Sequence, residues 1–337
     1  MPSIPASLPT RYLVASLGLL FVAVCMPLRA QTHPGQAQLV SEVAKDTGKN
    51  PQTLNALLDR AQKQQSILDA ISRPAEGKPW KDYRPIFLTD KRINDGIAFY
   101  REHRELLERT AKQYGVAPEY IVAIIGVETS YGRNTGKYKV LDALVTLGLY
   151  YPPRATFFRD QLKTLLELPD NHLAGPLDTL TGSYAGAQGW GQFMPSSIRD
   201  FGVDADGDGH IDLKNSLPDI FASVANYFAK HGWQTGGLVA LPAQPDAAAK
   251  PITVKDSSPQ WPLEQLEAWG YAPLQPLNPG APTSLQSLEG ANGMEYWFTF
   301  QNFYVITKYN RSPLYALAVH QLAQEIAEGV RMADARQ

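Results

Sequence analysis

The sequence is poor in cysteine and has no surplus of positive charge. Only one of its 337 residues is a cysteine, Cys25, and the formal net charge at pH 7 is −2. A single cysteine excludes a disulfide within the chain. Proteins that bind nucleic acids normally carry a basic surplus, so the charge argues against that class, and no nucleic-acid partner is expected.

Signature motifs of several enzyme classes are also missing. The chain has no His-Glu-x-x-His zinc helix, no Gly-x-Ser-x-Gly nucleophile elbow and no phosphate-binding loop. Its six histidines show no spacing typical of metal ligands. These absences argue against zinc-dependent, serine-dependent and nucleotide-dependent chemistry, and no organic cofactor is expected.

The N-terminal apolar run is too short to cross a membrane. It covers residues 12–26, whereas a membrane-spanning helix needs roughly 20 residues. With a basic residue before this run and the small Ala30 after it, residues 1–30 are typical of a secretory signal peptide. We therefore expect a protein of the Gram-negative periplasm. Cys25 could instead accept a lipid and anchor the protein to the outer membrane, but Val24 stands where lipoprotein signals usually have a small residue.

One stretch of the chain, PEYIVAIIGVETSYG at 118–132, predicts a buried helix that ends near a carboxylic acid. Pro118 suits the first helical position, and residues 121–127 are apolar on every face. No lysine or arginine stands one turn away from Glu128. A carboxyl group without a partner on a dry helix holds its proton unusually well, which is what a general acid requires. The alternative is that Glu128 merely marks the point where the helix meets water.

An Asp-rich loop at 204–212 matches the order of an EF-hand-type calcium loop. Neighbouring carboxylates repel one another unless a hard cation neutralises them, so we expect structural Ca²⁺ there. Asn215 occupies the position where such loops have a bidentate Glu, and Asp219 could complete the coordination instead. The expected ligands are Asp204, Asp206, Asp208, the carbonyl of His210, and Asp219. The alternative is a polar turn without a metal.

A glycine-rich loop at 182–193 is accompanied by aromatic and amide side chains. The glycines indicate a backbone that comes close to another group. Aromatic faces and amides are the groups that bind sugars, so the set suggests a carbohydrate groove, although core packing is the better explanation for any single aromatic. The set comprises Tyr131, Tyr150, Tyr151, Tyr184, Trp190, Tyr309, Tyr315, Gln188, Gln192 and Asn310.

The pattern of apolar residues predicts a mainly helical chain. Residues 72–90 are expected to be irregular, 91–114 to form one long helix, and 252–255 and 295–300 to form short strands. The expected organisation is a signal peptide at 1–30, an N-terminal helical region at 31–110, a catalytic core with the EF-hand-type loop at 111–236, a Pro-rich, β-containing insertion at 237–300, and a C-terminal segment at 301–337 that returns to the core.

Six segments together resemble the B family of lytic murein transglycosylases, enzymes that act on peptidoglycan. They are GVETSYG at 126–132, LDALVTLGLYYPPRATFF at 141–158, GSYAGAQGWGQFMPSS at 182–197, DADGDGHIDL at 204–213, SVANYFAKHGW at 223–233 and NFYVITKYNRSPLYALAV at 302–319. The resemblance implies a lysozyme-like helical core with an N-terminal helical extension and a small inserted β-containing subdomain. It also implies cleavage of the β-1,4 bond between N-acetylmuramic acid and N-acetylglucosamine, leaving a 1,6-anhydromuramic end.

The resemblance also assigns roles to individual residues. Glu128 matches the family's catalytic Glu, which acts first as acid and then as base. Ser183, Gln192, Tyr309 and Asn310 match groove residues near the acid or the acetamido group of the sugar. Tyr83, Arg154, Tyr184 and Tyr315 match positions that hold sugars or peptide stems, with a packing role as the alternative for Tyr315. Asp204, Asp206, Asp208 and the His210 carbonyl match the calcium loop, whereas the spacing before Asp219 departs from the family pattern. Pro153 stands where relatives can have a second Arg.

The expected partners are peptidoglycan glycan strands, with cell-wall synthesis or division proteins as further candidates, and the chain is expected to be a monomer. Two other functions stay open. A hydrolytic muramidase would need a second carboxylate to direct water. A non-catalytic, calcium-stabilised peptidoglycan-binding scaffold would need no acid at all.

Overall fold

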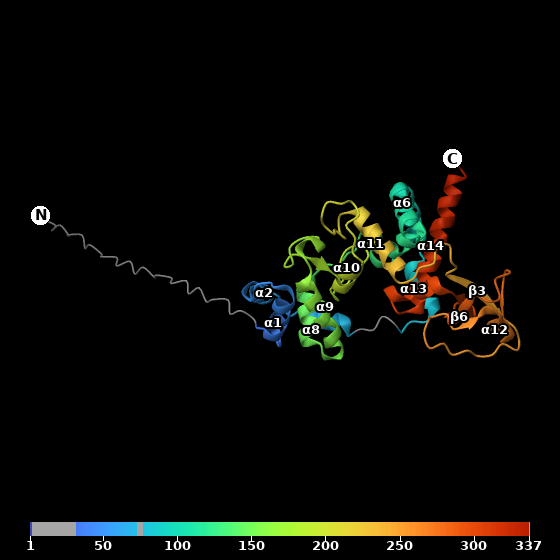
Figure 1. The fold of residues 1–337 in the computed structure, drawn as a ribbon, viewed down its shortest axis with the longest axis horizontal. Helices are drawn as coiled ribbons and strands as arrows, with labels where there is room; N and C mark the ends of the chain where they lie inside the picture. Colours follow the sequence, from blue (N-terminus) through green and yellow to red (C-terminus); the bar gives the residue numbers. More distant parts are fainter. Residues whose placement is uncertain (2–31, 73–76, 337) are drawn as a thin grey trace. The chain divides into compact units, whose positions relative to one another are not determined.

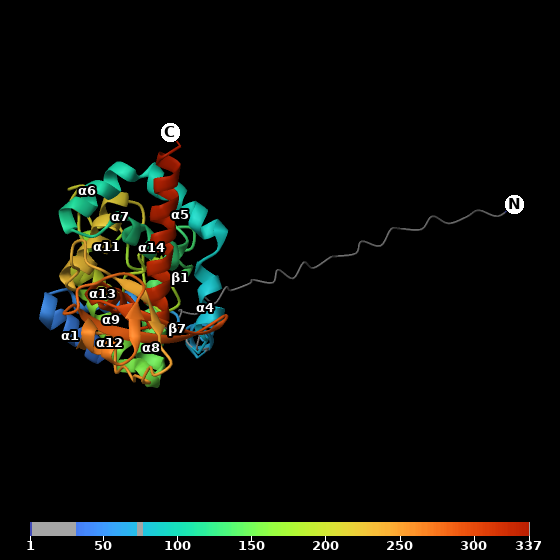
Figure 2. The same cartoon turned by 90° about the vertical axis from the view of Figure 1, so that its right-hand side faces the viewer.

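The helix predicted around residues 118–132 lies at the centre of the fold. In the computed structural model, which describes Met1 and residues 32–72 and 77–336, this helix is α7 (Pro118–Thr129). The side chains from Tyr120 to Val127 are buried. α7 packs against α14 (Pro313–Asp334), α5 (Asp90–Glu102), α6 (Arg104–Tyr114) and α11 (Leu217–Lys230), which surround it in Figure 2.

Helices make up most of the described chain. Among the described residues no helix has both the length and the apolar composition that a membrane span requires. The predicted signal peptide and Cys25 lie outside the described residues. The remaining helices are α1 (Gln36–Thr47), α2 (Pro51–Leu58), α3 (Gln65–Ile71), α4 (Trp80–Phe87), α8 (Val140–Tyr150), α9 (Ala155–Glu167), α10 (Pro195–Phe201), α12 (Leu263–Ala268) and α13 (Gln301–Tyr309), with 3₁₀ turns at Pro152–Arg154 and Asp170–His172.

Two of the predictions about helices were wrong. Residues 72–90 contain α4, although Pro79 precedes this helix and Pro85 lies inside it. The buried Trp80 holds the helix in place by packing and through a hydrogen bond from Nε1 to Glu295 Oε2 at 3.1 Å. The long helix predicted at 91–114 is divided into α5 and α6 at His103, whose backbone (φ −110°, ψ 19°) departs from helical values.

A five-stranded antiparallel sheet lies within residues 240–299. Its strand order is β4-β6-β7-β3-β5, and α12 packs against it (Figure 1). The strand predicted at 295–300 is present as part of β7, but 252–255 is not a strand, and β3 and β6 were not predicted. The strands are β3 (Ala240–Pro245), β4 (Trp261–Pro262), β5 (Tyr271–Pro273), β6 (Pro282–Gly290) and β7 (Gly293–Thr299). A separate two-stranded pair joins β1 (Tyr138–Lys139) and β2 (Thr181–Gly182).

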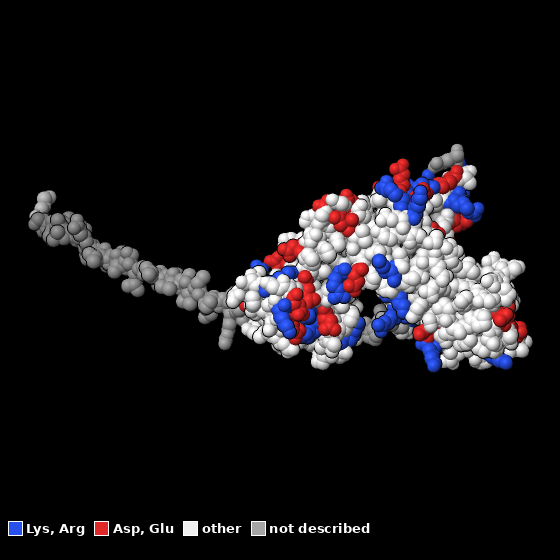
Figure 3. Space-filling model, in the orientation of Figure 1, with Lys and Arg blue, Asp and Glu red and all other residues white. Residues whose placement is uncertain are grey.

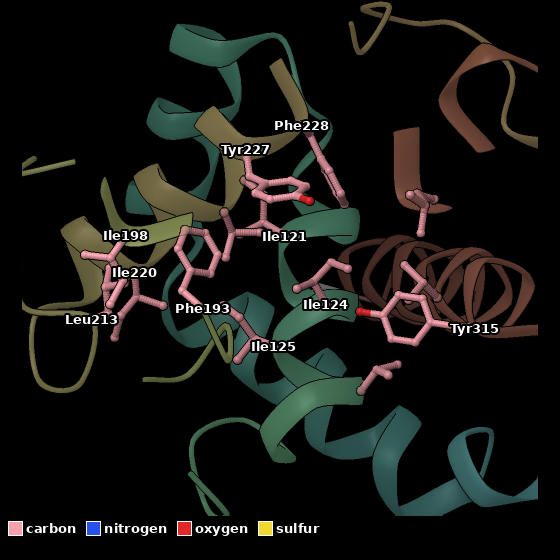
Figure 4. Close-up of a cluster of buried hydrophobic side chains, with 14 of the residues drawn as sticks. Ile121, Ile124, Ile125, Phe193, Ile198, Leu213, Ile220, Tyr227, Phe228 and Tyr315 are labelled. Carbon is pink, nitrogen blue, oxygen red and sulfur yellow. The ribbon is translucent and has the colours of Figure 1, made fainter. Parts of the chain in front are cut away.

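The buried apolar side chains form two clusters. The larger one runs through the helices and includes α7, with Ile121, Ile124 and Ile125 at its centre in Figure 4. The smaller one lies between the five-stranded sheet and α12, around Leu285 and Phe298, which face each other across β6 and β7. The helical cluster therefore supports the end of α7, while the sheet has a core of its own.

Candidate active site

Glu128 lies in the last turn of α7, where the chain leaves the helix sharply. Ser130 and Tyr131 have left-handed backbone conformations, with φ of 51° and 62°. These conformations are uncommon for residues other than glycine and turn the chain away from the helix. The half-buried side chain of Glu128 lines a cavity of about 540 Å³. The other described lining residues are Arg133, Asn134, Thr135, Gly136, Lys137, Tyr138, Ser183, Tyr184 and Gln192.

Tyr315 supplies the closest polar contact of this acid. Its hydroxyl donates a hydrogen bond of 2.6 Å to Glu128 Oε1. Figure 4 shows the hydroxyl of Tyr315 pointing from α14 toward α7. Burial raises the pKa of Glu128 to about 7, and the hydrogen bond from Tyr315 partly opposes this rise. The fold therefore holds a carboxyl group that is partly protonated near neutral pH.

The glycine-rich loop brings Ser183 and Gln192 to the same cavity. Ser183 Oγ accepts hydrogen bonds from the backbone N–H groups of Ala185 and Ala187, at 3.3 and 3.1 Å. Gln192 has φ of 52°, and its Nε2 donates to the carbonyls of Gly189 and Thr135, at 2.9 and 3.2 Å. Both side chains are fixed by the backbone around them, so the loop presents a preorganised wall.

The end of α7 is locked to this loop by contacts that the sequence did not predict. Thr129 Oγ1 donates to the carbonyl of Trp190 at 2.9 Å and accepts from the N–H of Gly132 at 3.0 Å. Gly132 has φ of 78°, and a Cβ added there would lie 2.2 Å from the ring of Trp190. The acid and the loop are thus positioned relative to each other by close packing.

Tyr309 and Asn310 come from the end of α13. The hydroxyl of Tyr309 donates to the carbonyl of Gly191 at 2.6 Å. Burial, and next the charge of Glu128, raise the pKa of Tyr309 well above its ordinary value. Asn310 is exposed, and its Oδ1 accepts from the N–H of Ser312 at 3.1 Å.

The remaining predicted substrate residues differ in their surroundings. Tyr184 is exposed and lines the cavity of Glu128. Tyr315 is 3% exposed, so only its hydroxyl faces the acid. Tyr83 is half-buried and packs on Phe87 with ring centroids 5.1 Å apart. Arg154 is exposed, and its guanidinium lies over the ring of Phe157, 4.8 Å from its centroid.

Three of the predicted calcium ligands come together. Asp204, Asp206 and Asp219 each offer a carboxylate oxygen, and these atoms lie within 4.8 Å of one another. Asp219 is 1% exposed, although its spacing in the sequence departed from the family pattern. Hard carboxylate oxygens at this separation fit Ca²⁺.

The other expected calcium ligands lie at the surface of the loop. Asp208 and His210 are exposed, and Asp208 Oδ1 accepts from the N–H of His210 at 2.8 Å. Asn215, which stands in place of the usual Glu, donates from Nδ2 to Asp212 Oδ2 at 2.8 Å. The third carboxylate of the cluster therefore comes from the buried Asp219 and not from position 215.

Comparisons with known proteins decide the family. A family model described as a transglycosylase SLT domain matches residues 31–324. The chain is 40% identical over 305 residues to the membrane-bound lytic murein transglycosylase B of Escherichia coli strain K12, covering 88% of this chain and 83% of that protein. The chain belongs to the SLT-type lytic murein transglycosylases. The resemblance found in the sequence is thereby confirmed, and so is the expectation of an enzyme.

Solved structures of this family share the fold. The catenated lytic transglycosylase SltB1 of Pseudomonas aeruginosa is 48% identical with a TM-score of 0.83, covering 88% of this chain and 98% of that one. The calcium complex of Slt35 from Escherichia coli is 40% identical with a TM-score of 0.80, covering 88% and 94%. SltB3 of Pseudomonas aeruginosa, in complex with NAG-anhNAM-pentapeptide, is 30% identical with a TM-score of 0.75, covering 86% and 78%. The prediction of a mainly α, lysozyme-like fold is confirmed.

Proposed function

We propose that this SLT-type transglycosylase uses Glu128 alone to cleave the β-1,4 bond between N-acetylmuramic acid and N-acetylglucosamine. The observation that supports this most strongly is the pKa of about 7 for Glu128 in a cavity that it shares with Ser183 and Gln192. A carboxyl group with such a pKa can give up a proton and take one back near neutral pH.

In the proposed reaction the proton of Glu128 goes to the glycosidic oxygen as the bond from that oxygen to C1 of the muramic residue breaks. The resulting carboxylate then takes the proton of the muramic 6-hydroxyl while its oxygen bonds to C1. Glu128 ends protonated, no water is consumed, and the product is a 1,6-anhydromuramic end. The hydrogen bond from Tyr315 engages Oε1, which leaves Oε2 to carry the transferred proton.

The lining of the cavity favours this reaction over hydrolysis. Among the described residues that line it, Glu128 is the sole carboxylic acid. A hydrolytic muramidase with two carboxylates would need another acid about 5 to 9 Å away to act as nucleophile or to activate water. We assign the stabilisation of the positive charge at C1 to the sugar's own acetamido group, with Ser183, Gln192, Tyr309 and Asn310 holding the sugar. We assign contacts with sugars or peptide stems to Tyr83, Arg154 and Tyr184, and the buried Tyr315 holds Glu128 through its hydroxyl.

We further propose that Ca²⁺ binds the Asp-rich loop. Asp204, Asp206 and Asp219 supply carboxylates, and Asp208 and the His210 carbonyl complete the set. The convergence of three carboxylate oxygens in this chain and the calcium complex of Slt35 support the assignment. The ion neutralises the repulsion among these carboxylates and thereby stabilises the loop.

The remaining proposals concern location and organisation. We place the enzyme in the periplasm, with residues 1–30 as its signal peptide, peptidoglycan glycan strands as its substrate, and the segments 31–110, 111–236, 237–300 and 301–337 as its structural divisions. The murein-directed relatives and the pentapeptide complex of SltB3 support this substrate.

The mass of the released muropeptides tests the reaction. We expect products lighter by one water than those that a lysozyme releases from the same sacculi. Glu128→Gln should release none while still binding murein, and the exposed Glu105→Gln on α6 should behave as the wild type. Hydrated ends would establish hydrolysis instead, and release by Glu128→Gln would remove this residue from the mechanism.

A further inference from the structure

A second cavity is lined by Lys308 and Arg311, the residues on either side of Tyr309 and Asn310. It has a volume of about 530 Å³, and its charged lining residues are Lys255, Asp256, Lys308 and Arg311, with His231 beside them. We refer to it as the basic pocket. Lys308 and Arg311 belong to the end of α13 and the turn after it, whereas Lys255 and Asp256 come from the segment between β3 and β4.

The lining of the basic pocket is positively charged, whereas the chain as a whole carries a negative net charge. The lining includes three cations and one acid, whereas the formal net charge of the chain is −2. Asp256 is engaged locally, because its Oδ1 accepts from the N–H of Ser258 at 2.8 Å and from the hydroxyl of the same residue. Within the described chain, neither Lys255 nor Arg311 forms a side-chain hydrogen bond or an ion pair. Two cations of the pocket are thus available to an anionic ligand.

The basic pocket is adjacent to the catalytic acid through one short stretch of chain. Arg311 and Pro313 line the pocket, and Tyr315, two residues further on, binds Glu128 Oε1 at 2.6 Å. Lys308 lines the pocket, while the next residue, Tyr309, reaches toward Gly191 in the catalytic loop. Figure 3 shows the surface hollowed beside α13, with lysine and arginine side chains gathered on that edge.

We propose that the basic pocket binds carboxylates of the peptide stem that the muramic residue carries. This inference rests on the proposed function, because it takes a murein strand as the substrate. A pentapeptide ends in a carboxylate and spans about 17 Å when fully extended, so its end can bind well away from the sugar that carries it. Lys255 and Arg311 then pair with the stem, and Lys308, whose Nζ donates to Tyr304 Oη at 2.6 Å, adds to the positive potential.

Substrates that differ only in their stems provide the test. Soluble glycan strands bearing peptide stems are compared with the same strands after an amidase has removed the stems. For the double variant Lys255→Ala/Arg311→Ala, we expect KM for stem-bearing strands to rise about tenfold at unchanged kcat, since two exposed ionic contacts are lost. The kinetics on stem-free strands serve as the internal reference and should match those of the wild type.

A matched control removes two cations elsewhere. Arg109→Ala/Lys112→Ala, on the exposed surface of α6, should leave both substrates unaffected. An unchanged KM of the pocket variant for stem-bearing strands would overturn the proposal, and so would an equal loss on both substrates. Failure of the wild type to cleave either substrate would instead contradict the proposed function, so the two failures can be told apart.

Discussion

At the scale of single residues, the burial of Glu128 lowers the stability of the folded protein at neutral pH. A shift of the pKa of Glu128 from 4.5 to about 7 corresponds to about 3 kcal/mol of lost stability once the group ionises. Because the folded pKa is raised, this penalty is absent below pH 4.5, grows between pH 4.5 and 7, and is complete above that range. The sequence predicted such an acid from the apolar run before it. It named Tyr315 as a residue that holds sugars or stems, but it could not predict the hydrogen bond to Glu128, which lies 187 residues away and meets Tyr315 only through the packing of α14 on α7.

The pH dependence of the reaction follows from the same group. Since the proposed reaction begins with protonated Glu128, kcat/KM should fall as the pH rises through about 7. The hydrogen bond from Tyr315 lowers this pKa, so Tyr315→Phe should move the alkaline limb to higher pH while activity at pH 6 stays within about tenfold of the wild type. Tyr114→Phe at the end of α6 is the control. A pH profile identical in Tyr315→Phe and the wild type would show that another group titrates.

At the scale of elements, the sequence predicted helices better than strands. α7 was predictable from its composition. The break between α1 and α2 has an equally local cause, because the side chain of Asn50 caps α2 and Pro51 begins it. The edges of β3 and β6 carry prolines, which mask strand patterns, whereas residues 252–255 have a strand-like pattern but no partner strand. Nothing in the sequence marks the break at His103, whose ring packs against Phe99 with centroids 4.6 Å apart.

The proposed calcium loop allows a prediction at the scale of elements, because Asp219 and Asp206 have different surroundings in it. Both oxygens of the buried Asp219 accept backbone hydrogen bonds, from Ala205 at 2.8 Å and Asp212 at 2.9 Å. An asparagine there would turn a donor toward one of these N–H groups. Asp219→Asn should therefore destabilise the protein by about 1 to 3 kcal/mol even without the ion. Asp206→Asn, at an exposed position, should remove mainly the stabilisation by calcium.

Calorimetry with calcium or with a chelator separates these two effects. Calcium at 100 times its dissociation constant should stabilise the wild type by about 2.7 kcal/mol. Asp206→Asn should melt at the same temperature in both solutions, and Asp219→Asn should melt below the chelated wild type. Identical melting of the wild type in both solutions would contradict the assignment of the loop to calcium.

At the scale of the whole molecule, the motifs indicated a groove where Glu128 meets the glycine-rich loop, but nothing in the sequence indicated the basic pocket. The cavity of Glu128 is closed by the end of α7 and the glycine-rich loop, and the basic pocket by α13 and a segment before β4. Segments this far apart in the chain meet only after the helices and the sheet have packed. The motifs identified the residues of the candidate site, and the tertiary structure determines which of them share a cavity.

Because the buried apolar side chains form two clusters, we expect the molecule to unfold in two steps. Phe298 is fully buried in the cluster between the sheet and α12, apart from the helical cluster around α7. Phe298→Ala should cost about 3 to 5 kcal/mol of local stability. Hydrogen exchange should therefore accelerate at residues 240–299 and stay slow in α7.

Leu322→Ala in α14, within the helical cluster, should instead accelerate exchange in α7. Equal acceleration in both regions for Phe298→Ala would show that the sheet and the helices unfold as one cooperative unit. In that case, a substitution that destabilises the sheet would destabilise the surroundings of Glu128 as much as those of the basic pocket.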